Sequence, residues 1–223
     1  MGDKAEVLRD EYRARFGDKG EYRNRVWKIL CDDYFKALLP PDATVLDLGS
    51  GWGEFINNID AATKYAMDLN PDAGHRLSGN TRFLHQDCSQ PWQLEKESLD
   101  VVFTSNFLEH LPDKWHLERT IAEAHRCLKQ DGLMICLGPN IKYVAGAYWD
   151  FWDHFIPLTE LSMGEVLHMK GFIIESSIAR FLPYSMSTGS TPPLLLVKLY
   201  LRLPVAWSYF GKQFLVVGRK GKR

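Results

Sequence analysis

The sequence lacks the features that mark several common classes of protein. Its four cysteines form no C-x-x-C pair, which argues against a zinc site or a disulfide framework and favours a reducing compartment, the cytoplasm. No stretch of about 18 uncharged apolar residues is present, so we expect no membrane-spanning helix. The first residues are charged rather than apolar, and we therefore expect no secretory signal.

An excess of charge of one sign is also missing. The chain has 27 Lys and Arg against 28 Asp and Glu, a net charge of −1, so its overall field does not favour nucleic acid as a partner. Apolar residues make up 45% and charged residues 25%, which is ordinary globular composition. A chain of 223 residues is long enough for one large domain with a substantial core.

The stretch from residue 43 to residue 54, ATVLDLGSGWGE, organises the rest of the chain. Val45, Leu46 and Leu48 predict a short buried strand that ends in turn-forming residues. Gly49 and Gly51 can take positive φ and leave no Cβ between the backbone and a ligand. We predict that a helix begins at 54–59, so that strand, turn and helix N-terminus form a ligand cradle.

The charges around this cradle indicate the kind of ligand. Gly49 and Gly51 match the first two places of the dinucleotide pattern G-x-G-x-x-G, but Glu54 stands at the third. Glu54 and Asp47 would repel a pyrophosphate and suit a ligand with a cationic end, such as S-adenosylmethionine. Asp68 follows 19 residues after Gly49, where an acidic residue accepts hydrogen bonds from ribose hydroxyls.

Residues 45–53, VLDLGSGWG, resemble the first motif of the class I S-adenosylmethionine-dependent methyltransferases. The likeness extends over about residues 25 to 175 and to a last strand near 214–218. It implies S-adenosyl-L-methionine as cofactor and S-adenosyl-L-homocysteine as product, with an acidic residue at the adenine amino group and the next side chain on the ring. The residues that the resemblance assigns to the cofactor are Asp47, Gly49, Ser50, Gly51, Asp68, Leu69, Asp87, Cys88 and Asn106. For Asp87 the structural alternative is a turn cap.

The sequence predicts an α/β fold, and the resemblance makes it a doubly wound, Rossmann-like, seven-stranded and mostly parallel sheet with helices on both faces. In that family the last strand inserts antiparallel between the fifth and the sixth. The strands that we expect are 45–48, 64–68, 81–85, 99–105, 133–138, 172–176 and 214–217. The helices that we expect are 5–16, 22–39, a short one at 70–79, 117–129 and 160–169. We also expect Gly132 to end a helix in the left-handed conformation, and residues 219–223 to fray.

Two units are expected, an N-terminal helical lid at 1–40 and a methyltransferase domain at 41–223 with an insertion at about 177–212. Family members often carry such a lid over cofactor and acceptor, where Arg23 and Arg25 could meet the methionine carboxylate. The alternative, which we favour for these two arginines, is a packing helix with a solvated basic face.

The residues after the fourth strand, NFLEHL at 106–111, match the family motif that borders the methyl group. Quinone-pathway O-methyltransferases have a related stretch with a further carboxylate, used for metal, where this chain has Asn106. Glu109 and His110 alone supply only two ligands, which is too few for a convincing metal site, so we expect no metal. For His110 a buried histidine that bonds to a backbone carbonyl is an alternative to a catalytic role.

An aromatic run at 143–155 follows the fifth strand and ends in Asp153 and His154. It suits an acceptor pocket for a flat or sugar-like group, and the alternative is a hydrophobic lid without substrate contact. A histidine ahead of the next helix often faces the acceptor in the resembled family. His154 is therefore the first candidate for a general base and His110 the second.

The insertion contains a polar stretch at 185–191, which we expect to be mobile, and an apolar stretch at 194–203 with Lys198 and Arg202 on one helical face. One interpretation of 194–210 is an interfacial segment that touches a membrane or a lipid-linked acceptor. The others are a dimer contact or a helix that covers the sheet edge, and the oligomeric state stays open.

Taken together, these patterns predict a methyltransferase for a small-molecule, sugar or lipid-linked acceptor, acting by in-line O-methylation. Two alternatives remain: a module that binds the cofactor without chemistry, and an NAD-dependent oxidoreductase. Glu54 argues against the second of these, as does the antiparallel last strand that the resemblance implies.

Overall fold

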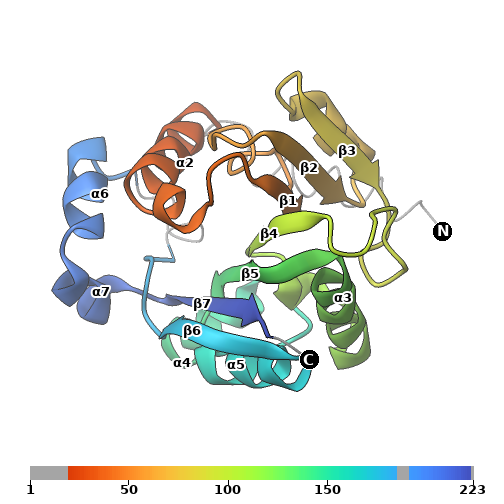
Figure 1. Cartoon of the computed structure of the whole chain (residues 1–223). Helices are drawn as coiled ribbons and strands as arrows, with labels where there is room; N and C mark the ends of the chain where they lie inside the picture. Colours follow the sequence, from red (N-terminus) through yellow and green to blue (C-terminus); the bar gives the residue numbers. More distant parts are fainter. Residues whose placement is uncertain (1–19, 185–190, 222–223) are drawn as a thin grey trace.

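The computed structural model describes residues 20–184 and 191–221. One seven-stranded sheet with the order β3-β2-β1-β4-β5-β7-β6 runs through this part of the chain (Figure 1). The strands are β1 Thr44–Leu48, β2 Thr63–Asp68, β3 Thr81–His85, β4 Leu99–Ser105, β5 Leu128–Pro139, β6 Phe172–Ile178 and β7 Gln213–Lys220. The neighbours from β3 to β5 pair in parallel, whereas β7 pairs antiparallel with both β5 and β6.

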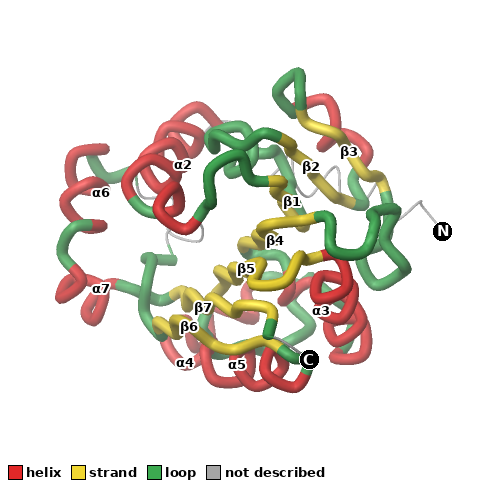
Figure 2. The backbone as a smooth tube through the Cα atoms, in the orientation of Figure 1, coloured by secondary structure: helices red, strands yellow, loops and turns green. Residues whose placement is uncertain are grey.

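Helices cover both faces of this sheet, and Figure 2 shows the strands as one twisted layer between them. The α-helices are α2 Gly20–Asp33, α3 Lys114–Cys127, α4 Ile141–Val144, α5 Glu160–Met169, α6 Leu194–Leu201 and α7 Pro204–Phe210. The 3-10 helices are η2 Phe35–Leu38, η3 Pro71–Arg76, η4 Leu108–His110 and η5 Ala145–Asp150. None of the helices in the described ranges combines the length and apolar character that crossing a membrane requires.

The core has two main layers because the central strands are apolar on both sides. Leu46 and Val102 pack against α3 and α5 on one face, with Ile121 and Leu167 among the buried residues there. On the other face, Phe103 lies in a cluster with residues of α2 and α6. Parallel strands that are buried on both faces read as apolar runs, which is why β1 and β4 could be predicted from the sequence.

Most of the predicted elements are confirmed. The bounds of β3, β4 and α5 are as predicted, and β7 inserts antiparallel between β5 and β6. Thr159 caps α5 through a reciprocal pair of bonds with Ser162, and Gly171 follows the helix at φ +95°. Asn70 caps η3, since its side chain accepts from the Asp72 N–H.

Four local predictions were wrong. Residues 54–59 form turns rather than a helix: the Asn58 side chain donates to the Glu54 carbonyl within the segment, and the Asn57 side chain donates to the carbonyl of Arg76 in η3. The helix predicted at 22–39 ends at Asp33 and is followed by η2. Asp131, not Gly132, takes the left-handed conformation, at φ 62°. Lys220 is buried in β7 rather than frayed, and it donates to the Leu128 carbonyl.

Two predictions fall on residues outside the described ranges. They are the amphipathic helix at 5–16 and all but the last residue of the polar stretch at 185–191. The division at residue 40 stays a prediction as well, although α2 does pack on the glycine turn: Gly20 lies against Trp52, and Arg23 forms a 2.8 Å ion pair with Glu54.

Candidate functional site

The turn after β1 has positive φ at three positions, all of them glycines. Gly49, Gly51 and Gly53 have φ values of 69°, 52° and 74°. A Cβ at Gly49 would lie 2.1 Å from Cγ of Phe107, which follows β4. The glycine turn and the residues after β4 are therefore in direct contact at the carboxyl end of the parallel strands, where ligands bind in open α/β sheets.

Asp68 ties the end of β2 to this turn. Its Oδ2 accepts a 2.8 Å hydrogen bond from the Gly51 N–H, and its Oδ1 accepts one of 2.8 Å from the Asn70 N–H. Burial raises the pKa of Asp68, and these backbone bonds oppose the rise. Each carboxylate oxygen keeps acceptor capacity for a further donor. Leu69 is 48% exposed beside it, as an apolar side chain against a ligand ring would be.

Asp47 places a second carboxyl group beneath the turn. It is buried at the end of β1, and burial together with the charges of Glu54 and Asp68 holds its pKa well above the ordinary range, although the Ile56 N–H opposes this. Arg23, for which the sequence left open a contact with the methionine carboxylate or a place on a packing helix, forms a 2.8 Å ion pair with Glu54 of the turn. A cationic ligand would relieve this accumulation of acidic groups.

Some buried polar atoms near the turn have no hydrogen-bond partner among the described residues. They include Oγ of Ser50 and Oδ1 of Asn106, the latter in a residue that takes φ 49° directly after β4. Buried polar atoms are nearly always paired, so these two indicate a polar ligand. S-adenosylmethionine fits this set, because it offers an ammonium to acceptors and hydroxyls to Asp68.

Asp87 and Cys88 are placed differently from each other. Oδ1 of Asp87 accepts bonds of 2.8 Å from the N–H and the hydroxyl of Ser89, so the residue does cap a turn. Its assignment to an adenine amino group stays a prediction. The Cys88 thiol points into the core toward Thr120, and burial raises its pKa to about 12. A thiol that points into the core gives no support to the expected contact between Cys88 and the adenine ring.

A histidine–carboxylate pair lies just after β4. Nδ1 of His110, in η4, is 3.1 Å from Oδ2 of Asp153 and 2.9 Å from the Asp153 carbonyl oxygen. Burial alone would lower the pKa of His110, but the bond to Asp153 and the charges of Glu109 and Asp153 raise it above 6.5. Because Nδ1 faces oxygens, it carries the hydrogen, and Nε2 is left as the proton acceptor.

His154 joins the same cluster from the aromatic run. Its ring lies 4.8 Å from that of His110, 4.5 Å from Tyr148 and 5.0 Å from Phe151. The N–H groups of the two residues that follow it donate to the Glu109 carbonyl, which holds the run against η4. The structure therefore brings together both histidines that the sequence singled out.

Donor atoms of Glu109, His110 and His154 lie within 4.8 Å of one another, a spacing that a metal ion could bridge. The structure thus adds His154 to the Glu109–His110 pair, so three candidate ligands lie together rather than two. Glu109 is fully buried, which raises the pKa of its carboxyl group, although the neighbouring His110 opposes the rise.

Sequence reasoning missed three contributors to this site. Phe107 lies on Gly49, Asp153 orients His110, and Tyr148 donates to the Ile156 carbonyl beneath His154. The one sequence feature that pointed to Asp153 was its position next to His154, a candidate general base. The other two depend on contacts between segments far apart in the chain.

The comparisons with known proteins agree with this geometry. A family model described as a methyltransferase domain matches residues 20–173, more than two thirds of the chain. A candidate methyltransferase, solved in complex with the methyltransferase activator Trm112 of Haloferax volcanii, superposes with a TM-score of 0.69 at 16% identity, over 100% of both chains. No protein with a curated description matches the sequence.

Two further solved structures have the same fold. A SAM-dependent methyltransferase of Archaeoglobus fulgidus gives a TM-score of 0.67 at 18% identity, covering 98% of this chain and all of its own. A SAM-dependent methyltransferase of Thermotoga maritima gives 0.66 at 16% identity, covering 94% of this chain and 98% of its own.

Proposed function

We propose that this chain, which belongs to the family of S-adenosylmethionine-dependent methyltransferase domains, methylates a hydroxyl oxygen of a small-molecule, sugar or lipid-linked acceptor. The observation that supports oxygen as the target is the Asp153–His110 pair after β4. An oxygen nucleophile has to lose a proton, whereas many amine and carbon acceptors need no dedicated base.

The cofactor would lie on the glycine turn. Asp68 would accept the ribose hydroxyls, while Asp47, Ser50 and Asn106 supply acceptors for the cationic end. When bound, the cofactor supplies an activated methyl group on a sulfonium. The protein then has mainly to align the acceptor and to take its proton.

His110 is the better of the two candidate bases. Asp153 fixes its tautomer and orientation through Nδ1, which directs Nε2 to the proton acceptor role. His154 is only 6% exposed and packs between aromatic rings, so it serves as a positioning residue. This order reverses the one expected from the sequence.

The aromatic run would supply the acceptor pocket. Trp149 and Trp152 lie in it and are exposed, Trp152 to 90%, although large apolar side chains are usually buried. They follow β5 at the same edge of the sheet as the glycine turn, where an acceptor would meet the cofactor.

Two measurements test this proposal. Titration calorimetry should show binding of S-adenosylmethionine and S-adenosylhomocysteine but not of NAD. Incubation with methyl-labelled cofactor and panels of sugars, lipid precursors, phenols and amines should place the label on an acceptor oxygen. Tighter binding of NAD, or label found only on nitrogen, would contradict the proposal.

A further inference from the structure

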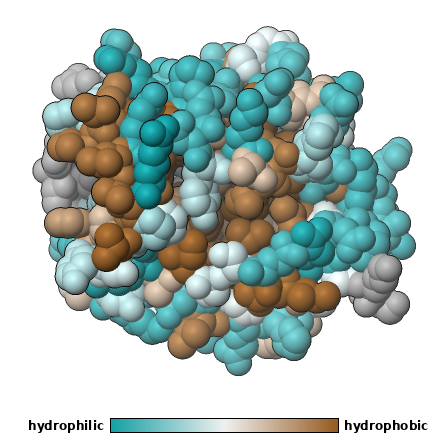
Figure 3. All heavy atoms as spheres, turned by 60° about the vertical axis from the view of Figure 1, so that its left-hand side comes forward, coloured by the Kyte–Doolittle hydropathy of each residue, from teal (hydrophilic) through white to brown (hydrophobic). Residues whose placement is uncertain are grey.

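The helices α6 and α7 expose an unusual amount of apolar surface. Leu195 is 75% and Tyr209 74% exposed. Other large apolar residues exposed on the same two helices and their junction are Leu196, Leu199, Leu203, Val205 and Phe210. We infer that this surface, the α6–α7 face, docks the enzyme onto the headgroup region of an anionic membrane. Figure 3 shows apolar side chains gathered on this side of the molecule, next to hydrophilic ones.

The inner sides of the two helices are anchored, so the exposed side chains belong to a fixed surface. The Tyr200 hydroxyl donates a 2.6 Å bond to the Phe181 carbonyl. Nε1 of Trp207 donates a 2.9 Å bond to the Tyr200 carbonyl, and Leu201 is buried in the core. The exposed leucines therefore belong to the outer side of two well-packed helices. A contiguous exposed apolar patch of this kind marks an interaction site.

Charge favours an anionic partner. Residues 176–223 contain eight Lys and Arg and no Asp or Glu, while residues 1–175 contain 19 Lys and Arg and 28 Asp and Glu. Arg219 and Lys220 of this region lie in β7 and pair with Glu175 and Glu97, so the basic charge of the α6–α7 face itself comes from Lys198 and Arg202. Basic residues near an anionic bilayer contribute about 1 kcal/mol each, so the sign of this region suits acidic lipids.

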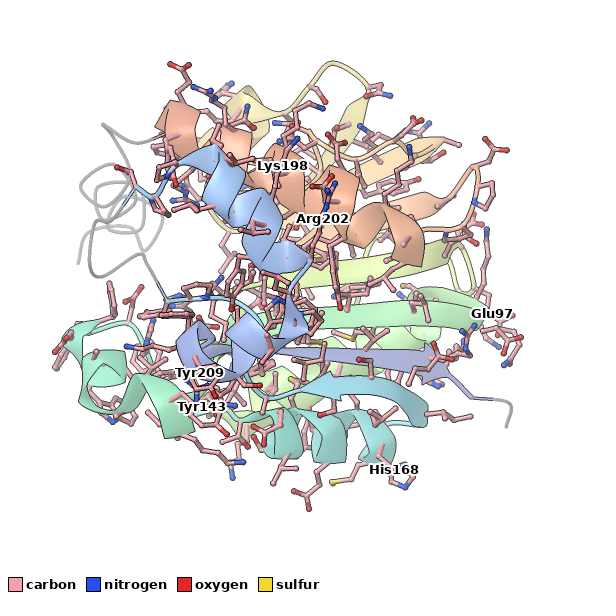
Figure 4. All side chains as sticks on the ribbon, turned by 90° about the vertical axis from the view of Figure 1, so that its left-hand side faces the viewer. Glu97, Tyr143, His168, Lys198, Arg202 and Tyr209 are labelled. Atoms are coloured by element: carbon pink, nitrogen blue, oxygen red, sulfur yellow. The ribbon has the colours of Figure 1, made fainter. Side chains whose placement is uncertain are left out.

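Lys198 and Arg202 stand among the exposed leucines of this face and point to the same side of the molecule (Figure 4). Long basic side chains can lay their methylene stems along apolar surface while the charged ends reach headgroups. Tyr209, labelled on α7 in the same view, adds the aromatic side chain that is enriched at membrane interfaces.

The α6–α7 face adjoins the proposed acceptor pocket through Arg180. The Arg180 guanidinium donates to the carbonyls of Tyr209 and Gly211 and lies 4.8 Å above the Tyr143 ring of α4. The segment that α4 begins continues to the exposed Trp149 and Trp152. Docking through this face would therefore bring the aromatic run near the bilayer, which deepens the proposed function by favouring a lipid-linked acceptor.

A second copy of the chain fits this face less well. A two-fold contact brings the same patch of both copies together. Residues 191–212 include Lys198, Arg202 and Lys212 and no acidic residue, so such a contact would place like charges opposite one another without a partner.

Flotation with lipid vesicles tests the inference without any need for an acceptor. The full-length protein should float with vesicles of phosphatidylcholine and phosphatidylglycerol in equal amounts, and much less with phosphatidylcholine alone. The double variant Leu195→Ser/Val205→Ser should bind the mixed vesicles about tenfold more weakly. Lys198→Gln and Arg202→Gln should each weaken binding about fivefold and reduce its salt dependence.

The matched control is Leu161→Ser/Ile173→Ser, which removes two exposed apolar residues from α5 and β6, outside the α6–α7 face. It should float like the wild type, and melting curves should show that both double variants are folded. Equal binding by wild type and the Leu195/Val205 variant would overturn the inference. So would a wild-type dimer in light scattering that this variant abolishes without any vesicle binding, since the face would then join two copies. Cofactor affinity, measured by calorimetry, is independent of either result, so failure here is distinct from failure of the methyltransferase assignment.

Discussion

The N–H of Gly51 donates a 2.8 Å hydrogen bond to Oδ2 of Asp68, so the glycine turn is fastened to the end of the neighbouring strand. The same carboxylate is the proposed ribose acceptor. One residue would therefore both shape the turn and contact the cofactor, which would couple the conformation of the turn to binding.

Asp68→Ala should weaken binding of S-adenosylmethionine by about 1.5–3 kcal/mol, or about 10- to 150-fold in Kd, because two charge-assisted bonds to ribose are lost. Titration calorimetry measures this. Glu165→Gln, which removes an exposed carboxylate from α5, should bind as the wild type does. An unchanged Kd in a folded Asp68→Ala protein would show that Asp68 does not contact the ribose.

The central strands of the fold were predictable because they are short, mostly apolar runs, as β1 and β4 illustrate. The failure at 54–59 has a local cause that propensity alone does not reveal. Asn57 accepts from Ser78 and donates to the Arg76 carbonyl, so its side chain serves a contact 20 residues away rather than a helix.

The candidate site was predictable only in its parts. Asp47, Gly49 and Asp68 follow a spacing that the sequence displays. The pairing of His110 with Asp153 joins residues 43 apart, and nothing in either segment specifies the other. The choice of His110 over His154 as the general base depends on this contact, because the contact with Asp153 leaves Nε2 of His110 as an oriented proton acceptor.

Asp47→Asn should stabilise the protein without cofactor. The raised pKa means that the folded state holds the proton more tightly than the unfolded chain, whose aspartates titrate near about 3.9. The stability from this group is therefore present at acid pH and is lost as pH rises through the folded pKa. Asparagine avoids that loss and can still accept from the Ile56 N–H.

Melting temperatures from pH 4 to pH 8 check this prediction. The difference between Asp47→Asn and wild type should grow with pH, while affinity for S-adenosylmethionine should fall because a negative charge is gone. A variant that melts below the wild type at neutral pH would contradict the account of Asp47.

The pH–rate profile should report the Asp153–His110 pair. As a base, His110 acts in its neutral form, so kcat/KM should rise with pH and level off above the raised pKa of the free enzyme. Asp153→Asn removes the negative charge that helps to raise this pKa and leaves only a weaker, neutral acceptor for Nδ1. Its rising limb should therefore move to lower pH, with a lower plateau because the ring is less well oriented. If the rise of kcat/KM stays at the same pH in Asp153→Asn, the pH dependence does not come from the Asp153–His110 pair.

Chelators should leave the activity intact. Glu109, His110 and His154 are close enough to share a metal ion, but methyl transfer from an activated cofactor needs no Lewis acid, and Asp153 already orients His110. Assays after dialysis against EDTA, with metal content measured before and after, test this expectation. Loss of turnover that zinc or magnesium restores would instead assign the three residues as metal ligands.

The most direct test of the account is the maximal rate of methyl transfer by His110→Asn, measured with labelled cofactor at saturating acceptor. We expect kcat to fall by about 10²–10⁴-fold with cofactor affinity unchanged, because the proton acceptor is lost while the glycine turn is intact. His154→Gln should retain most of the rate, and His168→Asn, on the distant surface of α5, should match the wild type (Figure 4). A near-native kcat in folded His110→Asn would contradict the central claim that the Asp153–His110 pair takes the acceptor's proton.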